Sequence, residues 1–425
     1  MATAVNDPAQ AESGFGNLRH AALSAFWFGS FFLWQPFTFV IIQDQVDALV
    51  PDRNSQGTAI GLAVSVGGLF AMAVPPLIGA MSDRLSTPFG RRRPIMIGAT
   101  ILTLPGFVLL ATANSYPQLV IGYGWVQFFF NAAGAAFAGI IPDVVPAQQF
   151  GRASGFLATM VQLGSGAGLF SYSLLHGAHQ DRWMYLAFAI VIVATLVPTS
   201  LAAAGEGSQP VPHREPQPVA AALREFFGPL MGGDFAWVVF TRFFVSAGIT
   251  AVATYLLNFF RDVVNVSDPP GFLTLWFLVV LVVAIPFGLA GGLFSDRTHR
   301  RKVFVYASGG FQALVALVFI VFYPTAQPLV YALGAAYGIG YGLYYAVDWA
   351  LACDTLPDRK NSAKDMGLFH IALTLPQFVV PFFAGRALDY FNHASHNSGY
   401  RVVFASAIVL LGLGTFFVSR IKTVR

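Results

Sequence analysis

The stretch Gly79–Met96, GAMSDRLSTPFGRRRPIM, concentrates charge between two apolar runs. It contains four arginines and one aspartate, although only 10% of the 425 residues are charged. Positive charge of this kind is typical of a short cytoplasmic loop that joins two membrane-spanning helices. We therefore interpret the stretch as such a loop, with one hydrophobic segment ending before it and another starting after it.

The composition of the whole chain supports this interpretation. Hydrophobic residues make up 56% of the sequence and the mean hydropathy is +0.64, whereas soluble proteins carry about 25% charged residues. A helix needs about 20 apolar residues to cross a membrane, and a β-barrel would show short alternating segments instead. We predict an all-α membrane protein with twelve transmembrane helices, at about residues 20–43, 57–81, 93–113, 117–140, 153–175, 183–204, 235–260, 271–294, 302–323, 328–351, 365–388 and 400–420.

Lysine and arginine are distributed unevenly between the predicted loops. If the N-terminus is cytoplasmic and the sides alternate, 18 of the 24 fall on the cytoplasmic side. This bias predicts that both termini are cytoplasmic. The first eighteen residues contain two acids and no lysine or arginine, so we expect a polar tail there and not a cleaved signal. Because the positive charges follow topology, we expect the lipid bilayer and no nucleic acid as a partner.

Part of the opening stretch has a second copy later in the chain, because a motif of three of its residues recurs at an offset of 213. Outside that stretch, Asp143 corresponds to Asp354 at an offset of 211. Such self-similarity indicates an internal repeat. We predict an N-terminal tail (1–19), a six-helix bundle (20–204), a cytoplasmic linker (205–234), a second six-helix bundle (235–420) and a C-terminal tail (421–425). The recurring motif residues are Gly79, Asp83 and Arg84, which correspond to Gly292, Asp296 and Arg297.

The duplicated acid–base residues have two interpretations. They are either latches that bias which face of a two-halved bundle is open, or solvated helix ends whose ion pairs contribute only about 0–1 kcal/mol. Duplication in both halves favours the latch. The predicted gating residues are Gly79, Asp83, Arg84, Arg91, Arg92, Asp143, Asp296, Arg297 and Asp354.

The loop motif of the major facilitator superfamily resembles the set Gly79, Asp83, Arg84, Gly90, Arg91 and Arg92. Twelve spans in a six-plus-six repeat resemble the fold of that superfamily. The insertion LSTPF before GRRRP (Gly90–Pro94) resembles the sucrose-type and glycoside–cation symporter branch. The resemblance implies a rocker-switch transporter with one central site between the halves, and sugar uptake coupled to a cation gradient. In melibiose-type relatives, acids in the second helix bind the cation. Residues 57–81 contain no Asp or Glu, so we expect protons and not sodium.

Few ionisable residues fall inside the predicted spans, and each is a functional candidate because charge in hydrocarbon is costly. Arg242 has three candidate partners: Asp348, Asp44 and Asp262. It either binds solute and tunes an acid, or extends to the cytoplasmic interface. His370 either relays protons or is a neutral, hydrogen-bonded histidine. The predicted proton-coupling set is Asp44, Arg242, Asp348 and His370.

Neutral polar and aromatic side chains form a second set of candidate functional residues. Sugar hydroxyls need paired donors and acceptors, and the sugar ring needs a flat apolar surface. The alternative role is hydrogen bonding between helices without solute contact. The predicted substrate-binding residues are Trp34, Gln35, Gln127, Asn131, Gln162, Arg242, Asn258 and Gln377.

Taken together, the sequence predicts a monomeric secondary active transporter of the plasma membrane. It would move a small polar solute, a sugar or glycoside, by alternating access with protons. A facilitator or exporter of amphiphilic molecules is the alternative within this class; a membrane-embedded enzyme or receptor is the alternative outside it. We expect no enzyme, no cofactor and no metal, because a phosphate-binding loop and an H-E-x-x-H motif are absent and Cys353 is the single cysteine.

Overall fold

The computed structural model describes residues 16–82, 85, 87–146, 149–204, 224, 226–298, 300–356 and 362–422. Within these ranges all regular structure is helical. The described residues do not include Asp83 and Arg84. They also leave out most of the two predicted tails and most of the predicted linker. The helices are α2 (Asn17–Pro36), η1 (Phe37–Ile41), α3 (Ile42–Leu49), α4 (Arg53–Ser82), α5 (Arg93–Ala111), α6 (Tyr116–Val144), α7 (Phe150–Gly177), α8 (Trp183–Ala202), η3 (Gly228–Met231), α10 (Asp234–Phe259), η4 (Phe260–Val264), α11 (Pro269–Thr298), α12 (Arg301–Phe322), α13 (Gln327–Thr355), α14 (Ser362–Ala394) and α15 (Ser398–Val418).

Twelve membrane-length helical segments occur in the described part of the chain, as the sequence predicts. The first consists of α2, η1 and α3, and the seventh of α10 and η4. Ten of the segments are long and apolar enough to cross a membrane. The other two, α7 and α13, have 28 and 29 residues, but their many glycine, serine and tyrosine residues lower the hydropathy. Helices suit a bilayer because each satisfies its own backbone hydrogen bonds.

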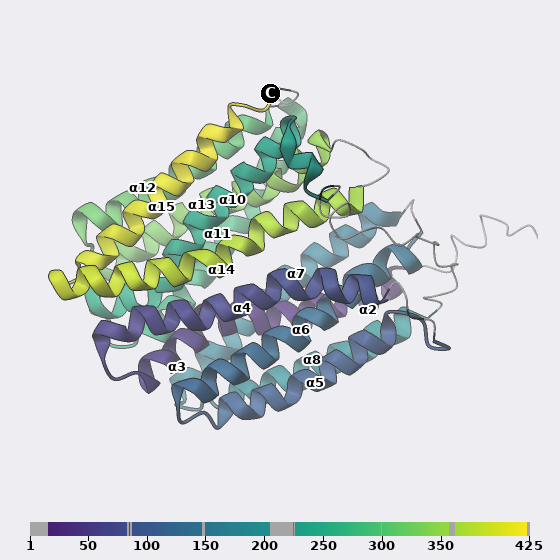
Figure 1. The fold of residues 1–425 in the computed structure, drawn as a ribbon, viewed down its shortest axis with the longest axis horizontal. Coiled ribbons are helices and arrows are strands. Elements are labelled where there is room, and N and C mark those ends of the chain that lie inside the picture. The colour runs from purple at the N-terminus through teal and green to yellow at the C-terminus, as the bar shows by residue number, and fades with distance from the viewer. Residues whose placement is uncertain are drawn as a thin grey trace, which may run out of the picture. The chain divides into compact units, whose positions relative to one another are not determined.

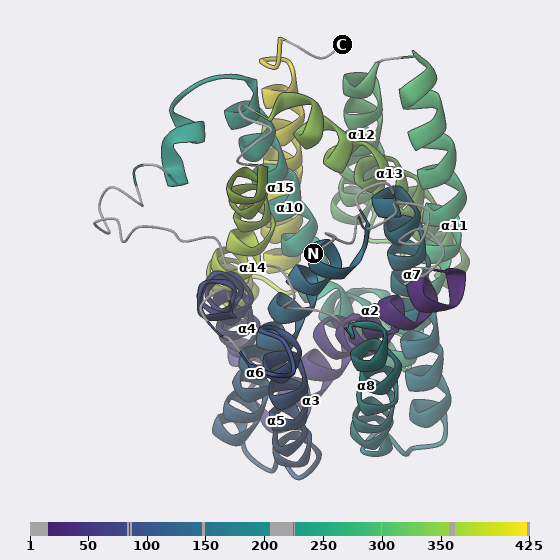
Figure 2. The ribbon, with the colours of Figure 1, turned by 90° about the vertical axis from the view of Figure 1, so that its right-hand side faces the viewer.

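Four helix pairings recur in both halves of the chain. In the first half, α2 packs on α7 and α8, and α5 packs on α6 and α8. In the second half, α10 packs on α14 and α15, and α12 packs on α13 and α15. Figures 1 and 2 show two of these pairs, α5 beside α6 and α10 beside α15. Each half therefore packs its first helix on its fifth and sixth, and its third on its fourth and sixth, as expected for an internal repeat.

The described residues fall into two compact units. One lies within Met1–Phe37 and Ala73–His213, and the other within Thr38–Met72 and Arg214–Arg425. The chain thus changes unit inside the first span and again inside the second. The first change coincides with the π-helix η1. The second lies just before Pro75 and Pro76 in α4, where proline lacks the N–H that an α-helix needs.

Within the second unit, the first half of α4 packs tightly along α14 (Figure 1). A Cβ at Gly61 would collide with the carbonyl oxygen of Pro381, so only glycine permits this approach. Asp389 of α14 accepts hydrogen bonds from the backbone N–H groups of Gly57 (2.9 Å) and Thr58 (2.6 Å). The segment 38–72 is therefore attached to helices of the C-terminal half.

Candidate functional site

A buried ion pair joins α10 to α13. An Arg242 guanidinium N–H donates to Asp348, and the two residues are only 7% and 4% exposed. The Arg242 guanidinium carbon also lies 3.7 Å from the ring centroid of Phe369 on α14, a cation–π arrangement. Of the three partners considered from the sequence, the structure pairs Arg242 with Asp348. His370 follows Phe369 directly and is exposed.

The first half of the repeat has an aromatic contact where the second half has this pair. Asp348 lies six residues before Asp354, and Phe137 lies six residues before the equivalent Asp143. Phe137 packs on Phe26 of α2, with ring centroids 4.8 Å apart. The fold can therefore fill this position with apolar side chains. Because hydrophobic replacement of a buried ion pair is often neutral or stabilising, stability alone does not account for the charges.

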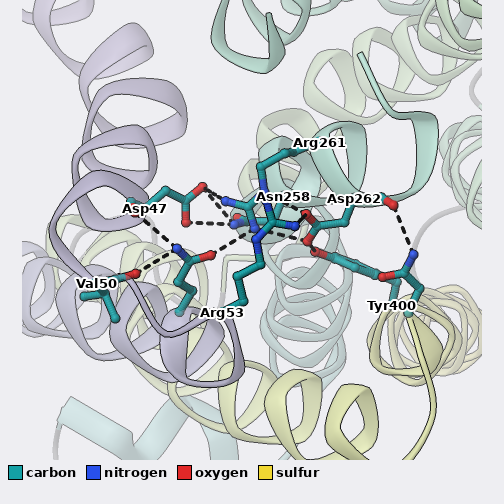
Figure 3. A network of polar contacts seen from close by, with 9 residues as sticks. Asp47, Val50, Arg53, Asn258, Arg261, Asp262 and Tyr400 are labelled. Atoms are coloured by element: carbon teal, nitrogen blue, oxygen red, sulfur yellow. Dashed lines mark hydrogen bonds and ion pairs between the residues drawn. The ribbon is translucent and has the colours of Figure 1, made fainter. Parts of the chain in front are cut away.

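A second polar cluster lies where the first span meets the seventh (Figure 3). Arg261 donates to Asp47 (2.5 Å) and to both carboxylate oxygens of Asp262 (2.7 and 3.1 Å). Asn258 donates to both oxygens of Asp47, at 2.9 and 3.0 Å. The Tyr400 hydroxyl donates to Asp262 at 2.6 Å. We call these five residues the outer network, because the charge bias of the loops predicts that they lie at the outer ends of the spans.

Further contacts tie the outer network to the start of α4. Gln56 accepts from Arg261 (3.0 Å) and donates to the backbone oxygens of Asp47 (3.1 Å) and Val50 (2.8 Å). Arg53 lies 3.7 Å from Asp262, although its side chain is 73% exposed. Two carboxylates thus face two guanidinium groups, so the cluster is close to charge balance. It joins α3 and α4 to α10, η4 and α15.

At the predicted inner ends of the spans, each half carries an acid–base corner. Arg91 donates to both oxygens of Asp143, at 2.7 and 3.2 Å, and Arg92 lies 3.5 Å from the same carboxylate. In the second half, Arg301 donates to Asp354. In the first half, the basic cluster after the second span therefore contacts the end of the fourth span. In the second half, the cluster after the eighth span contacts the end of the tenth span. Such a corner fixes the loop against the bundle by charge-assisted hydrogen bonds.

Comparison with known proteins agrees with this architecture. The sequence profile of the Major Facilitator Superfamily matches residues 21–381. The chain belongs to the Major Facilitator Superfamily. It is therefore a multi-pass membrane transporter of small solutes and not an enzyme.

Two solved structures illustrate the superfamily fold of this chain. The nucleoside transporter NupG has a TM-score of 0.71 and 14% identity, covering 95% of this chain and 99% of that one. An inward-facing, unoccupied bacterial homolog of the human lysosomal transporter Spinster has a TM-score of 0.71 and 13% identity, covering 95% and 97%. Identities this low show a shared fold, and the solute of this superfamily member must be argued from its own residues.

The predicted polar residues of the first half lie on α2, α6 and α7. Gln127 donates to the Tyr123 hydroxyl (2.8 Å), and Asn131 donates to the Gln127 side-chain oxygen (2.9 Å). These side chains therefore share one face of α6 and bond along it. Trp34 packs on Phe130, with centroids 5.4 Å apart. Gln35 and Gln162 are half-buried on α2 and α7.

The remaining predicted residues are spread over the second unit and the loop ends. Asn258 belongs to the outer network, far along α10 from Arg242. The Gln377 backbone lies where α14 approaches Gly68 of α4. Asp44 is half-buried on α3. Gly79 lies on α4, and Arg297 is exposed on the last turn of α11; Asp296 shares that turn, but its side chain is outside the described part.

The site residues predicted from the sequence do not include Asp47, Arg261 and Tyr400. The available signal was a set of charges at the predicted outer ends of the first and seventh spans. A π-turn inserts one extra residue, which rotates the following helix by about 100°. Because η1 and η4 interrupt these two spans, a regular helical period misplaces the residues beyond them. No group of three or more His, Cys, Asp or Glu in the described residues could hold a metal ion.

Proposed function

We propose that this transporter is a proton-coupled secondary transporter of a sugar or glycoside, in the plasma membrane with both termini in the cytoplasm. The Arg242–Asp348 pair supports this proposal most directly. It is buried, it occurs in only one half of the repeat, and Phe26 and Phe137 show that the fold works without it. Intramembrane charges of this kind mark solute and proton pathways.

The pair provides a simple way to couple a proton to a solute. When Asp348 accepts a proton it loses its charge, and its attraction to the Arg242 guanidinium falls. Arg242 then needs another acceptor, because an unpaired buried charge is costly. A solute hydroxyl oxygen can accept from the guanidinium, while a second hydroxyl bonds to the Asp348 carboxyl group. Proton and solute therefore favour each other's binding, which is the reciprocity that linkage requires. His370, beside Phe369, is the proposed proton relay.

In alternating access, the outer network would hold helix ends together at the outer side, and the inner corners would hold loops in place at the inner side. The outer network holds the ends of the first two spans on α10, η4 and α15. The Arg261–Asp47 contact lies within the second compact unit, so an opening toward the outer side breaks it only if α3 separates from η4. The inner corners lie within each half, so they fix the loops against their own bundles while the chain, working as a monomer, changes state.

Uptake into proteoliposomes tests this function. Purified protein is reconstituted, and labelled sucrose and methyl glucosides are offered with and without an imposed pH gradient. We expect accumulation above equilibrium that needs the gradient and collapses with a protonophore. Uptake that only equilibrates and ignores the gradient would indicate a facilitator. Extrusion of amphiphilic dyes with no sugar uptake would indicate an exporter. Either result contradicts proton-coupled sugar transport.

A further inference from the structure

Three tyrosines form a ladder on one face of α13. Tyr337, Tyr341 and Tyr345 recur every four residues, which places them on the same side of a helix. Their ring centroids are 6.2 Å and 4.6 Å apart in succession. Asp348 comes three residues after Tyr345, so it continues this face. The ladder therefore ends at the Arg242–Asp348 ion pair.

The ladder continues in the other direction as a chain of aromatic contacts. Trp276 of α11 lies 5.6 Å from Tyr337 between centroids, and Phe277 lies 5.4 Å from Trp276. Phe39, in the first span, lies 5.3 Å from Phe277. All six rings belong to the second compact unit. We call them the aromatic track: Phe39, Phe277, Trp276, Tyr337, Tyr341 and Tyr345.

The tyrosine face of α13 lies opposite an exposed position of the same helix. Ala332 is exposed on α13 and lies nine residues before Tyr341, which is about two and a half helical turns. These two side chains therefore lie on opposite sides of the helix. Gly338 and Gly342 lie against α11, because a Cβ at either would collide with an α11 carbonyl oxygen. Tyr345 is nevertheless 41% exposed, so its ring is open to a small molecule.

The fold itself does not require the ladder. At the repeat offset of 211, the first half carries Val126, Phe130 and Gly134 in place of the three tyrosines. A side chain at Gly134 would meet nothing within 4 Å, so that position is left open. The tyrosines and the ion pair therefore occur together on one helix face, and both are missing from its counterpart.

The chemistry of this face selects a particular class of solute. The tyrosine rings offer flat apolar surfaces to the C–H face of a ring, and their hydroxyls donate and accept hydrogen bonds. The Arg242 guanidinium donates hydrogen bonds whether or not Asp348 carries the coupled proton, and the Asp348 carboxyl group has an oxygen that accepts in both states. This combination suits a hydroxyl-bearing molecule.

We infer that Tyr341, Tyr345 and the Arg242–Asp348 pair form a binding subsite for a neutral, ring-shaped polyol, with the ring stacked on the tyrosines and its hydroxyls on the ion pair. This inference rests on the proposed function and adds the requirement for a ring. An open-chain polyol with the same hydroxyl groups lacks the flat face and binds poorly.

Paired ligands and variants test the subsite. Thermal unfolding of the purified protein is measured with ring polyols (sucrose, methyl glucoside, myo-inositol) and with open-chain sorbitol and mannitol. Ring compounds should raise Tm and open-chain compounds should not, because only bound ligand stabilises. Tyr345→Leu should weaken ring binding about five- to tenfold through lost stacking, whereas Tyr345→Phe retains most of it. Tyr390→Leu, at an exposed position on α14, is the matched control and should bind as the wild type does.

The outcomes separate the subsite from the transport proposal. If sugar uptake is proton-driven but Tyr345→Leu leaves KM and ring preference unchanged, the subsite is wrong and the function stands. If ring polyols bind but a pH gradient drives no uptake, the function is wrong and the subsite stands. Equal Tm shifts with sorbitol and methyl glucoside, or no shift with any ring polyol, overturn the subsite.

Discussion

At the predicted inner ends of the fourth and tenth spans, the two halves carry the same ion pair, Arg91 with Asp143 and Arg301 with Asp354. Six residues earlier they differ, because Phe137 stands in the first half where the second half has Asp348. The ion pair found in both halves occupies a corner that each bundle needs to hold its loop. The Arg242–Asp348 pair, found in the second half, occupies a place that the first half fills with aromatic rings. A feature present in one copy only is the better guide to the solute.

The largest effect should come from the pair that has no counterpart. Asp348→Leu leaves Arg242 buried without its partner, which costs about 3–5 kcal/mol and should lower Tm sharply. The double variant Arg242→Leu with Asp348→Leu resembles the first half, so it should regain stability. Its uptake should nevertheless stay at least about 100-fold below wild type, a barrier near 2.7 kcal/mol at about 1.36 kcal/mol per tenfold.

Uptake and thermal unfolding of these two variants check this prediction. Proton-driven accumulation by the stable double variant would show that the ion pair serves only the fold. Phe26→Leu, which removes the ring that packs on Phe137 in the first half, provides the control. It should lower Tm moderately and leave proton coupling intact.

An intermediate effect is expected in the outer network. Asp47→Asn removes one carboxylate from Arg261 while Asp262 remains, so the network weakens by about 1.5–3 kcal/mol, the range for a charged hydrogen bond. The ends of the first two spans should then separate more often from α10. In a Cys353→Ser background, maleimide should label Val264→Cys about tenfold faster in the Asp47→Asn variant.

Arg53→Gln sharpens the comparison within that network. Arg53 is 73% exposed and 3.7 Å from Asp262, so its loss should change labelling less than about twofold. Equal acceleration by Arg53→Gln and Asp47→Asn would mean that surface charge alone controls access.

The smallest effects should separate the two inner corners. Asp143 contacts both Arg91 and Arg92 and its side chain is 12% exposed, whereas the Asp354 side chain is 42% exposed. Exposed pairs contribute about 0–1 kcal/mol. Asp354→Asn should therefore reduce the uptake rate less than about twofold, and Asp143→Asn about three- to fivefold. Initial rates at normalised protein levels measure both. A larger loss from Asp354→Asn would reverse the assignment.

Much of the fold follows from hydropathy and repetition, because a bilayer forces long apolar helices. The twelve spans and the duplicated Asp143 and Asp354 were visible in the sequence for this reason. The Arg242–Asp348 contact was among the partners expected, since intramembrane charges are few enough to enumerate. In each of these cases a local pattern carried the information.

The outer network was not visible, because its partners are far apart in sequence and its helices are irregular. Asp47 and Arg261 are 214 residues apart, and π-turns precede the first and contain the second. The sequence prediction named Asp44, at the outer end of the first predicted span, and did not name Asp47 on the same helix. The glycine contact between α4 and α14 and the Asp389 hydrogen bonds were missed for a similar reason: nothing in the local sequence says which helix a glycine approaches.

The placement of η1 and of Pro75–Pro76 has a mechanical consequence. In the described residues the chain passes from one compact unit to the other at only these two places, inside the first span and inside the second. Any displacement of one unit against the other must be absorbed there or in the linker. Both places have an interrupted hydrogen-bond ladder, so they resist bending less than a regular helix does. Each of the first two spans is thus divided between the two compact units and can bend at the irregular point where it is divided.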